Sequence, residues 1–146
     1  MSVFLPVSLK ITDKKILIIG GGKVALQKTR SLKKFTSHIT IVAAKICKQL
    51  KNMGFTYTEK EYSSADLAGI YLVYACTNNN SINENIMHDA HHRGLLVNVV
   101  DNPTLCDFIC PAIYKNGNMT VAVSSNGKNI SKSIYWRNNI KELLLK

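Results

Sequence analysis

The sequence has no apolar run near the roughly 20 residues that a membrane-spanning helix needs. Its N-terminus also lacks a basic region followed by a long apolar stretch. We therefore expect no secretory signal and predict a cytoplasmic location. Proline and glycine are scarce, with three and eight residues, which excludes collagen-like and low-complexity stalk proteins.

Cysteine and acidic residues are few as well. None of the four cysteines, Cys47, Cys76, Cys106 and Cys110, forms a C-x-x-C pair, and in a reducing compartment we expect them to be thiols. Lys and Arg outnumber Asp and Glu by 19 to 9, a formal net charge of +10, which attracts polyanions. The sequence shows no helix-turn-helix, zinc-finger or aromatic-basic RNA motif, so we expect neither a nucleic acid nor a membrane as partner.

What the chain does have is an alternation of strand-like and helix-like segments. The predicted strands are 15–20, 38–43, 55–60, 70–76 and 95–100, and the predicted helices are 24–35, 45–53 and 80–93. This order is typical of right-handed parallel crossovers. It predicts an α/β fold with a Rossmann-like, doubly wound parallel sheet.

The pattern changes after residue 100. Apolar runs at 108–114 and 119–124 flank Asn116-Gly117, which predicts a β-hairpin, and 130–145 is expected to be a helix. We predict a dinucleotide-binding domain at 1–112 and a hairpin-helix extension at 113–146, which serves dimerisation and substrate binding.

A glycine-rich turn lies where the first strand meets the first helix. Gly20-Gly21-Gly22-Lys23-Val24-Ala25 fits G-x-G-x-x-G/A, in which the glycines allow a tight turn and close approach to a pyrophosphate, and the last small residue allows close helix packing. The alternative is a glycine turn without a ligand. The second strand is followed by Ala44 and Lys45, with no acid to hold a ribose, so the choice between NAD and NADP stays open.

Several ordered segments together resemble one family. They are Phe4-Leu5-Pro6-Val7, the glycine turn with Lys28 and Arg30 behind it, Ala75-Cys76-Thr77-Asn78, Val97-Asn98-Val99-Val100-Asp101, Cys106-Asp107-Phe108 and Val121–Lys128. In order and spacing they resemble the precorrin-2 dehydrogenase family, the dehydrogenase/chelatase module of siroheme synthases. The likeness covers nearly the whole chain.

The resemblance implies NAD-dependent oxidation of precorrin-2 to sirohydrochlorin in siroheme or cobalamin synthesis. It also implies a homodimer that shares the region after the sheet. Some family members insert ferrous iron, and whether iron or cobalt is inserted here stays open. Many members continue beyond the helix at 130–145 into a region that covers the substrate, so the need for a partner protein is open too.

Oxidation of this tetrapyrrole removes a hydride and a proton, and therefore needs a base. Asp101 directly follows a buried strand, at the edge where open α/β sheets bind ligands, and the resemblance matches it to the family's catalytic aspartate. The alternative is a turn residue in Asp-Asn-Pro. Asp107 is a second candidate base, for which we favour a structural role.

Further polar residues are candidate ligands. Thr77 and Asn78 are expected to bind the cofactor or to lie in a helix cap. Ser124, Ser125, Gly127 and Lys128 are expected to bind substrate carboxylates, with helix capping as the alternative. Asn98 is a further candidate for substrate binding, if the register of its strand turns it toward the ligand. His88, His91 and His92 share a helix, which we interpret as a solvated face, and we expect no metal site.

Two other functions remain as alternatives. A dinucleotide-sensing regulatory module would need the glycine turn but no base at Asp101. A nucleic-acid-binding protein would account for the positive charge and would show steeply salt-dependent binding.

Overall fold

The computed structural model describes residues 1–146, which divide into two compact units. The larger is Leu9–Asp107, and the smaller joins Met1–Ser8 to Phe108–Lys146. The division into domains at residues 112 and 113 stays a prediction. No helix is long and apolar enough to cross a membrane.

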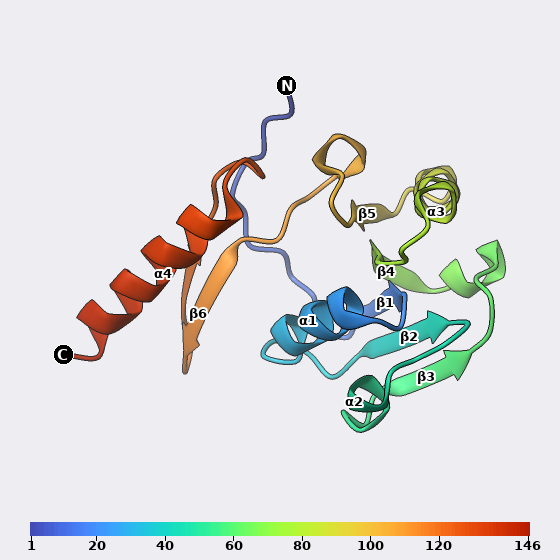
Figure 1. Cartoon of the computed structure of the whole chain (residues 1–146), viewed down its shortest axis with the longest axis horizontal. Coiled ribbons are helices and arrows are strands. Elements are labelled where there is room, and N and C mark those ends of the chain that lie inside the picture. Colours follow the sequence, from blue (N-terminus) through green and yellow to red (C-terminus); the bar gives the residue numbers. More distant parts are fainter. The chain divides into compact units, whose positions relative to one another are not determined.

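The larger unit is built on a five-stranded parallel sheet (Figure 1). Its strands are β1 (Lys15–Ile19), β2 (Ile39–Ala43), β3 (Thr56–Glu59), β4 (Ile70–Ala75) and β5 (Leu96–Val99). Their order in space is β3-β2-β1-β4-β5, so the chain reverses direction across the sheet between β3 and β4. This confirms the predicted doubly wound parallel sheet.

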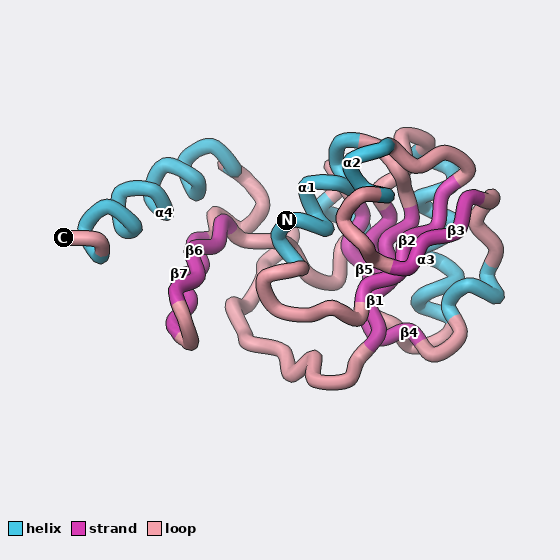
Figure 2. Tube along the Cα trace, turned by 90° about the horizontal axis from the view of Figure 1, so that it is seen from below, coloured by secondary structure: helices cyan, strands magenta, loops and turns pink.

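Helices cover both faces of this sheet (Figure 2). The helices α1 (Lys23–Leu32) and α2 (Lys48–Lys51) contact each other, whereas α3 (Asn80–His92) contacts β4, β5 and the short 3₁₀ turn η1 (Ser64–Leu67). A second 3₁₀ turn, η2 (Pro103–Leu105), follows β5. Coverage from both sides explains why the inner strands are continuous apolar runs.

The central strand carries the core. Ile16, Leu17, Ile18 and Ile19 are each at most 1% exposed, because β1 has a strand on either edge and helices on either face. Leu17 and Ile19 pack with Val73, Ile86 and other buried residues under α3. Ile86, on α3, is fully buried.

The helix expected at 45–53 is wrong in extent, since α2 spans only Lys48–Lys51. Two backbone amides before it are bound elsewhere. Ile46 N donates to Glu59 Oε2 at 3.2 Å, and Cys47 N donates to Gly21 O at 2.8 Å. These bonds hold residues 45–47 in an irregular loop against the glycine turn.

The smaller unit contains the predicted hairpin and the last helix. Strands β6 (Ala112–Asn116) and β7 (Met119–Val123) pair antiparallel, and α4 (Ile130–Leu144) packs on both. Gly117, the first of the two loop residues, has a φ of 57°, the left-handed conformation that glycine allows in tight hairpin turns. Arg137 Nη1 donates to Ile113 O at 3.1 Å, which ties α4 to β6.

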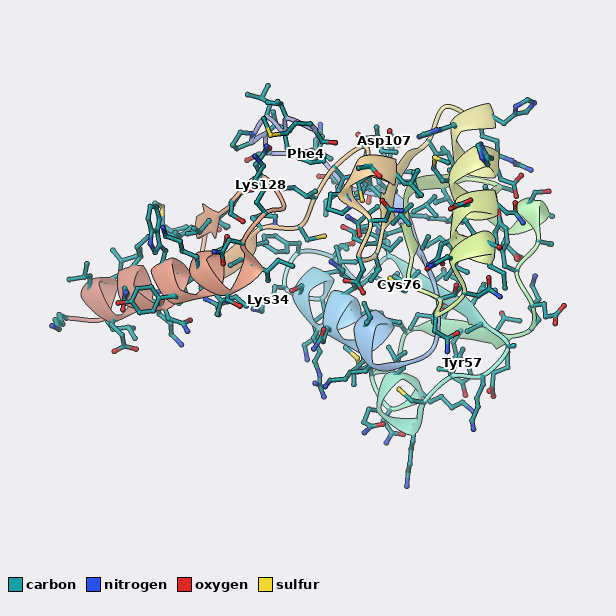
Figure 3. All side chains as sticks on the ribbon, turned by 45° about the horizontal axis from the view of Figure 1, so that its top comes forward. Phe4, Lys34, Tyr57, Cys76, Asp107 and Lys128 are labelled. Carbon is teal, nitrogen blue, oxygen red and sulfur yellow. The ribbon has the colours of Figure 1, made fainter.

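The first residues of the chain belong to this smaller unit. The amide of Asn126 holds them, because its Oδ1 accepts from Phe4 N at 2.7 Å and its Nδ2 donates to Ser2 O at 2.8 Å. Figure 3 labels Phe4 and Lys128 close to each other at this point. The side-chain amide of Asn126 thus pairs with one backbone N–H and one backbone C=O of the N-terminal segment, as the backbone of a neighbouring strand would.

Candidate functional site

A large open cavity lies at the carboxyl ends of the parallel strands. Its volume is about 1320 Å³, which exceeds the usual pocket for a single small molecule and suits an extended ligand. It is bordered by the glycine turn, by the loops after β2, β3 and β4, by α3, and by Val100 and Asp101 after β5. All these segments belong to the larger unit, and this edge of an open parallel sheet is where ligands bind.

The glycine turn forms the floor of the cavity. Gly20 has a φ of 141°, and a Cβ on it would lie 2.4 Å from Cys76 O, while one on Gly21 would lie 2.0 Å from Lys45 O. Both positions therefore exclude any side chain. Gly22 is different, since a Cβ there meets nothing within 4 Å and protein packing alone does not require glycine.

The first amides of α1 suit an anionic group. Gly22 is the N-cap and makes no side-chain cap bond, and the first turn contains no acid. Lys23 and Val24 line the cavity, whereas Ala25 is fully buried beneath them. Uncapped amides, the positive end of the helix dipole and a lysine favour phosphate at this point. The residues present thus fit the pyrophosphate of a dinucleotide.

Beyond the pyrophosphate region, the loops after β2 and β3 border the cavity. Ala44 and Lys45 line it, as does Glu61, an acid that the sequence analysis did not single out. Glu59, which ends β3, is bound by the protein itself. Hydrogen bonds from Lys51 Nζ at 2.5 Å and Ile46 N at 3.2 Å hold the pKa of its carboxyl below the usual value.

Thr77 and Asn78 also border the cavity, but the hydroxyl of Thr77 is already bonded within the loop. It lies 2.6 Å from Oδ1 of the buried Asn83 and accepts from Asn79 N at 3.2 Å. Asn83 Nδ2 in turn donates to Thr77 O at 3.0 Å. Asn79 is the N-cap of α3, so the capping alternative describes this loop, and a cofactor contact through Asn78 or backbone groups stays a prediction.

Tyr62 and Asp89 form a further part of the lining that the sequence did not reveal. The Tyr62 hydroxyl donates to Asp89 Oδ2 at 2.9 Å, which joins the loop after β3 to α3. Partial burial raises the pKa of this hydroxyl well above its ordinary value, and Asp89 raises it further. Tyr62 therefore remains a hydrogen-bond donor at neutral pH. No local motif marks this contact, because the two residues are 27 positions apart.

Asp101 also lines the cavity, two residues after the end of β5. Its side chain is exposed and its φ is 59°, a left-handed conformation that only Gly, Asn and Asp adopt readily. Val100 N donates to Ala75 O at 3.1 Å, which anchors the turn to β4. The structure thus brings Asp101 and the glycine turn to one cavity, as the sequence predicted.

The other candidate acid, Asp107, is not part of the cavity lining. Figure 3 labels it in the loop that follows β5. Its Oδ2 accepts from Val97 N at 2.9 Å, and its carboxylate pairs with His91 Nε2 at 2.9 and 3.0 Å. These contacts agree with the structural role that we favoured for Asp107.

The predicted substrate residues lie elsewhere. Asn98 is buried in β5 at 5% exposure, and its Nδ2 lies 3.6 Å from Cys106 Sγ. The others, Ser124, Ser125, Gly127 and Lys128, belong to the smaller unit. There Ser125 Oγ accepts from Asn129 N at 2.8 Å, ahead of α4. Their role towards substrate stays a prediction. No group of three or more His, Cys, Asp or Glu side chains in residues 1–146 is arranged to hold a metal ion.

Comparison with known proteins assigns the part of the chain that contains this cavity to a family. A family model described as "Putative NAD(P)-binding" matches residues 7–112, a range that contains the whole cavity lining. The chain belongs to this family. Membership in an NAD(P)-binding family agrees with the fit of the glycine turn and the start of α1 to a dinucleotide.

Relatives of this family member carry more specific names. A siroheme synthase of Ectopseudomonas mendocina is 40% identical over 126 residues, and one of Nitrosococcus oceani is 37% identical over 128 residues. Each alignment covers 85% of this chain but only 27% of the relative. The chain thus spans about a quarter of the length of these relatives.

A solved structure shares the fold. The structure named "SirC, precorrin-2 dehydrogenase" superposes with a TM-score of 0.81 over 95% of this chain and 70% of that one. The two sequences are 19% identical, so this likeness shows the fold alone. The structural likeness extends beyond residues 7–112, the range of the family match, because 95% of the chain includes part of the smaller unit.

Proposed function

We propose that this chain is an NAD-dependent precorrin-2 dehydrogenase that forms sirohydrochlorin in siroheme or cobalamin synthesis. The observation that carries the proposal is the cavity of the larger unit, whose lining contains both the glycine turn and Asp101. The names of the siroheme synthases and of the similar solved structure agree with it. The family description alone specifies a cofactor but no substrate.

The glycine turn and its neighbours would hold the cofactor. Gly20, Gly21 and Gly22 allow the pyrophosphate to approach the backbone, and the amides of Lys23 and Val24 donate to it. Ala44, Lys45, Thr77 and Asn78 line the same cavity. Ala44 and Lys45 would hold the adenosine ribose, and Thr77 and Asn78 would contact the nicotinamide or its ribose. When bound, the nicotinamide supplies the hydride acceptor.

Asp101 would accept the proton. Conversion of precorrin-2 to sirohydrochlorin takes away one hydride and one proton, and the carboxylate of Asp101 receives the proton as a new O–H bond. Exposure on the cavity side lets it pass the proton on to water. If iron is inserted afterwards, the same carboxylate can accept the pyrrole protons that ferrous iron displaces.

The direct test is turnover. Wild-type protein incubated with NAD and precorrin-2 should give the absorbance of sirohydrochlorin together with NADH. Asp101→Asn should keep the Kd for NAD and lower kcat by about 10²- to 10⁴-fold, the usual contribution of a positioned base. Full activity in Asp101→Asn would refute the base. Tight NAD binding by a wild type that never turns over would instead favour a nucleotide-sensing module.

We further propose that the smaller unit forms a homodimer and binds the substrate carboxylates. Apolar side chains of α4 are exposed in the single chain, among them Tyr135 at 63%, Trp136 at 53% and Leu143 at 69%. Burial of such side chains against a second copy is favourable. Sedimentation should give twice the chain mass for wild type and the chain mass for Trp136→Glu. A wild-type monomer at working concentrations would refute the dimer.

A further inference from the structure

We propose that Cys106 is a positioning residue for Asp101, whose thiol fixes the backbone turn that presents this carboxylate to the cavity. The inference rests on the proposed function, because it assigns a role to Cys106 only through the base at Asp101. Cys106 itself is not part of the cavity lining.

The thiol lies inside the turn that carries Asp101. Its Sγ is 3.1 Å from both Val99 N and Val99 O, and 3.3 Å from Asn102 O. Val99 is two residues before Asp101 and Asn102 is one residue after it. The sulfur accepts from Val99 N, and the single S–H donates to Val99 O or to Asn102 O. When the S–H donates to Asn102 O, this one side chain binds the backbone on both sides of the base.

The position of β5 explains why the thiol is needed. This strand lies at the edge of the sheet and has β4 as its only neighbour. The outward backbone groups of Val97 and Val99 therefore have no strand partner. Asp107 binds those of Val97 through its backbone N and its carboxylate. Cys106 Sγ accepts from Val99 N and lies 3.1 Å from Val99 O, which also accepts from Asn102 N at 3.2 Å. Two consecutive residues thus close the loop onto the strand edge.

The hydrogen bonds to Cys106 help to keep the backbone conformation of Asp101. Asp adopts a φ of 59° more readily than most residues with a Cβ, but it still prefers right-handed and extended conformations, so the turn depends on its hydrogen bonds to keep this φ. The bonds to Cys106 fix the residues on either side and limit relaxation of the turn. Small displacements of a catalytic group cost rate steeply, so loss of the thiol should lower kcat more than it affects binding.

The test compares Cys106→Ala and Cys106→Ser with Cys110→Ala, in which the same side chain is removed at an exposed position. We expect Cys106→Ala to lower kcat about tenfold or more, with KM and the Kd for NAD within twofold of wild type. Cys106→Ser keeps a donor and an acceptor at the same position and should retain more activity than Cys106→Ala. Cys110→Ala should match wild type.

Hydrogen exchange gives a local readout that does not depend on turnover. In Cys106→Ala, or in Cys106→Ser if the alanine variant does not fold, the Val99 amide should exchange faster. The Val97 amide, held by Asp107, should keep its protection and serves as the internal reference. Equal acceleration of both amides would mean general loosening of the strand and would overturn the proposal.

The outcomes separate this inference from the proposed function. If wild type turns over and Asp101→Asn does not, but Cys106→Ala retains full kcat, only the role of Cys106 is refuted. A parallel loss of NAD binding and of kcat in both Cys106 variants would also refute it, because it indicates a structural defect. If wild type does not turn over, both proposals fail together.

Discussion

Gly21 and Gly22 are neighbours in the same turn but differ in their surroundings. A methyl group on Gly21 would lie 2.0 Å from the carbonyl oxygen of Lys45, whereas one on Gly22 would meet open space in the cavity. Gly21→Ala should therefore destabilise the fold by about 1 to 3 kcal/mol through overpacking, as measured by urea unfolding.

Gly22→Ala should have the opposite profile. The backbone of Gly22 has a φ of −99°, which alanine adopts freely, so stability should change by less than about 1 kcal/mol. The added methyl group lies among the lining of the cavity and should weaken NAD binding about tenfold, or about 1.4 kcal/mol, in calorimetric titration. Unchanged affinity would contradict the placement of the pyrophosphate at this turn.

Glu59 links stability to pH. Because bonds from Lys51 and Ile46 lower the pKa of its carboxyl in the folded state, its ionised form stabilises the fold at pH values above the ordinary pKa of 4.5. That stabilisation is lost as pH falls through the lower pKa of the folded state.

Glu59→Gln should therefore reduce the loss of urea-unfolding stability on acidification below pH 4.5. Glu84→Gln makes the same change on the exposed side of α3 and serves as the matched control. Identical acid profiles for wild type and Glu59→Gln would show that the bonds of Glu59 to Lys51 and Ile46 contribute nothing to this pH dependence.

At the scale of single residues, the sequence predicts the position of those residues whose place is fixed by the strand just before them. The glycine turn and Asp101 were predicted because each directly follows an apolar strand, and the end of a parallel strand is known from the chain order alone. Tyr62, Glu61 and Asp89 were missed, because their contacts depend on how the loop after β3 meets α3. The capping role of Asn79 was not assigned either, although it is local.

At the scale of elements, the start of α3 depends on a small polar network. Asn83 is 3% exposed and binds Thr77 through both ends of its amide. Asn83→Ala should leave these buried groups without partners and cost about 1 to 3 kcal/mol. The urea midpoint measures this loss, and Asn85→Ala, at an exposed asparagine of the same helix, serves as the control for helix propensity.

The same scale shows where periodicity succeeds and fails. The strands at 15–19, 39–43 and 70–75 agree with prediction within one residue, because burial on both faces gives long β-branched runs. The helix expected at 45–53 is only four residues long, since the bonds of Ile46 N to Glu59 and of Cys47 N to Gly21 O hold the chain before it in an irregular loop. These contacts come from residues distant in sequence and leave no local pattern.

For the whole molecule, the cavity lining and the apolar core of the sheet lie within the larger unit. A fragment of residues 7–112, the range of the family match, should therefore unfold cooperatively and bind NAD within about tenfold of the full chain. Circular dichroism and calorimetric titration check this. An unfolded fragment would show that the smaller unit is needed for folding.

The same fragment should not oxidise precorrin-2 if the smaller unit holds substrate carboxylates or forms the dimer. Addition of NAD and substrate to the fragment, with the full chain as control, tests this. Full turnover by the fragment would remove any catalytic need for Ser124, Ser125, Gly127 and Lys128.

The central place of β1 has a consequence for synthesis on the ribosome. Of the five strands of the sheet, β1 is translated first, and β2 can pair with one of its edges soon afterwards. Its other edge pairs with β4, at Ile70–Ala75, so it waits for more than fifty further residues of nascent chain. During that interval an apolar strand edge is open to pairing with other chains. Binding of a chaperone to the emerging chain should therefore matter most before β4 is synthesised and should no longer be needed once β4 pairs with β1.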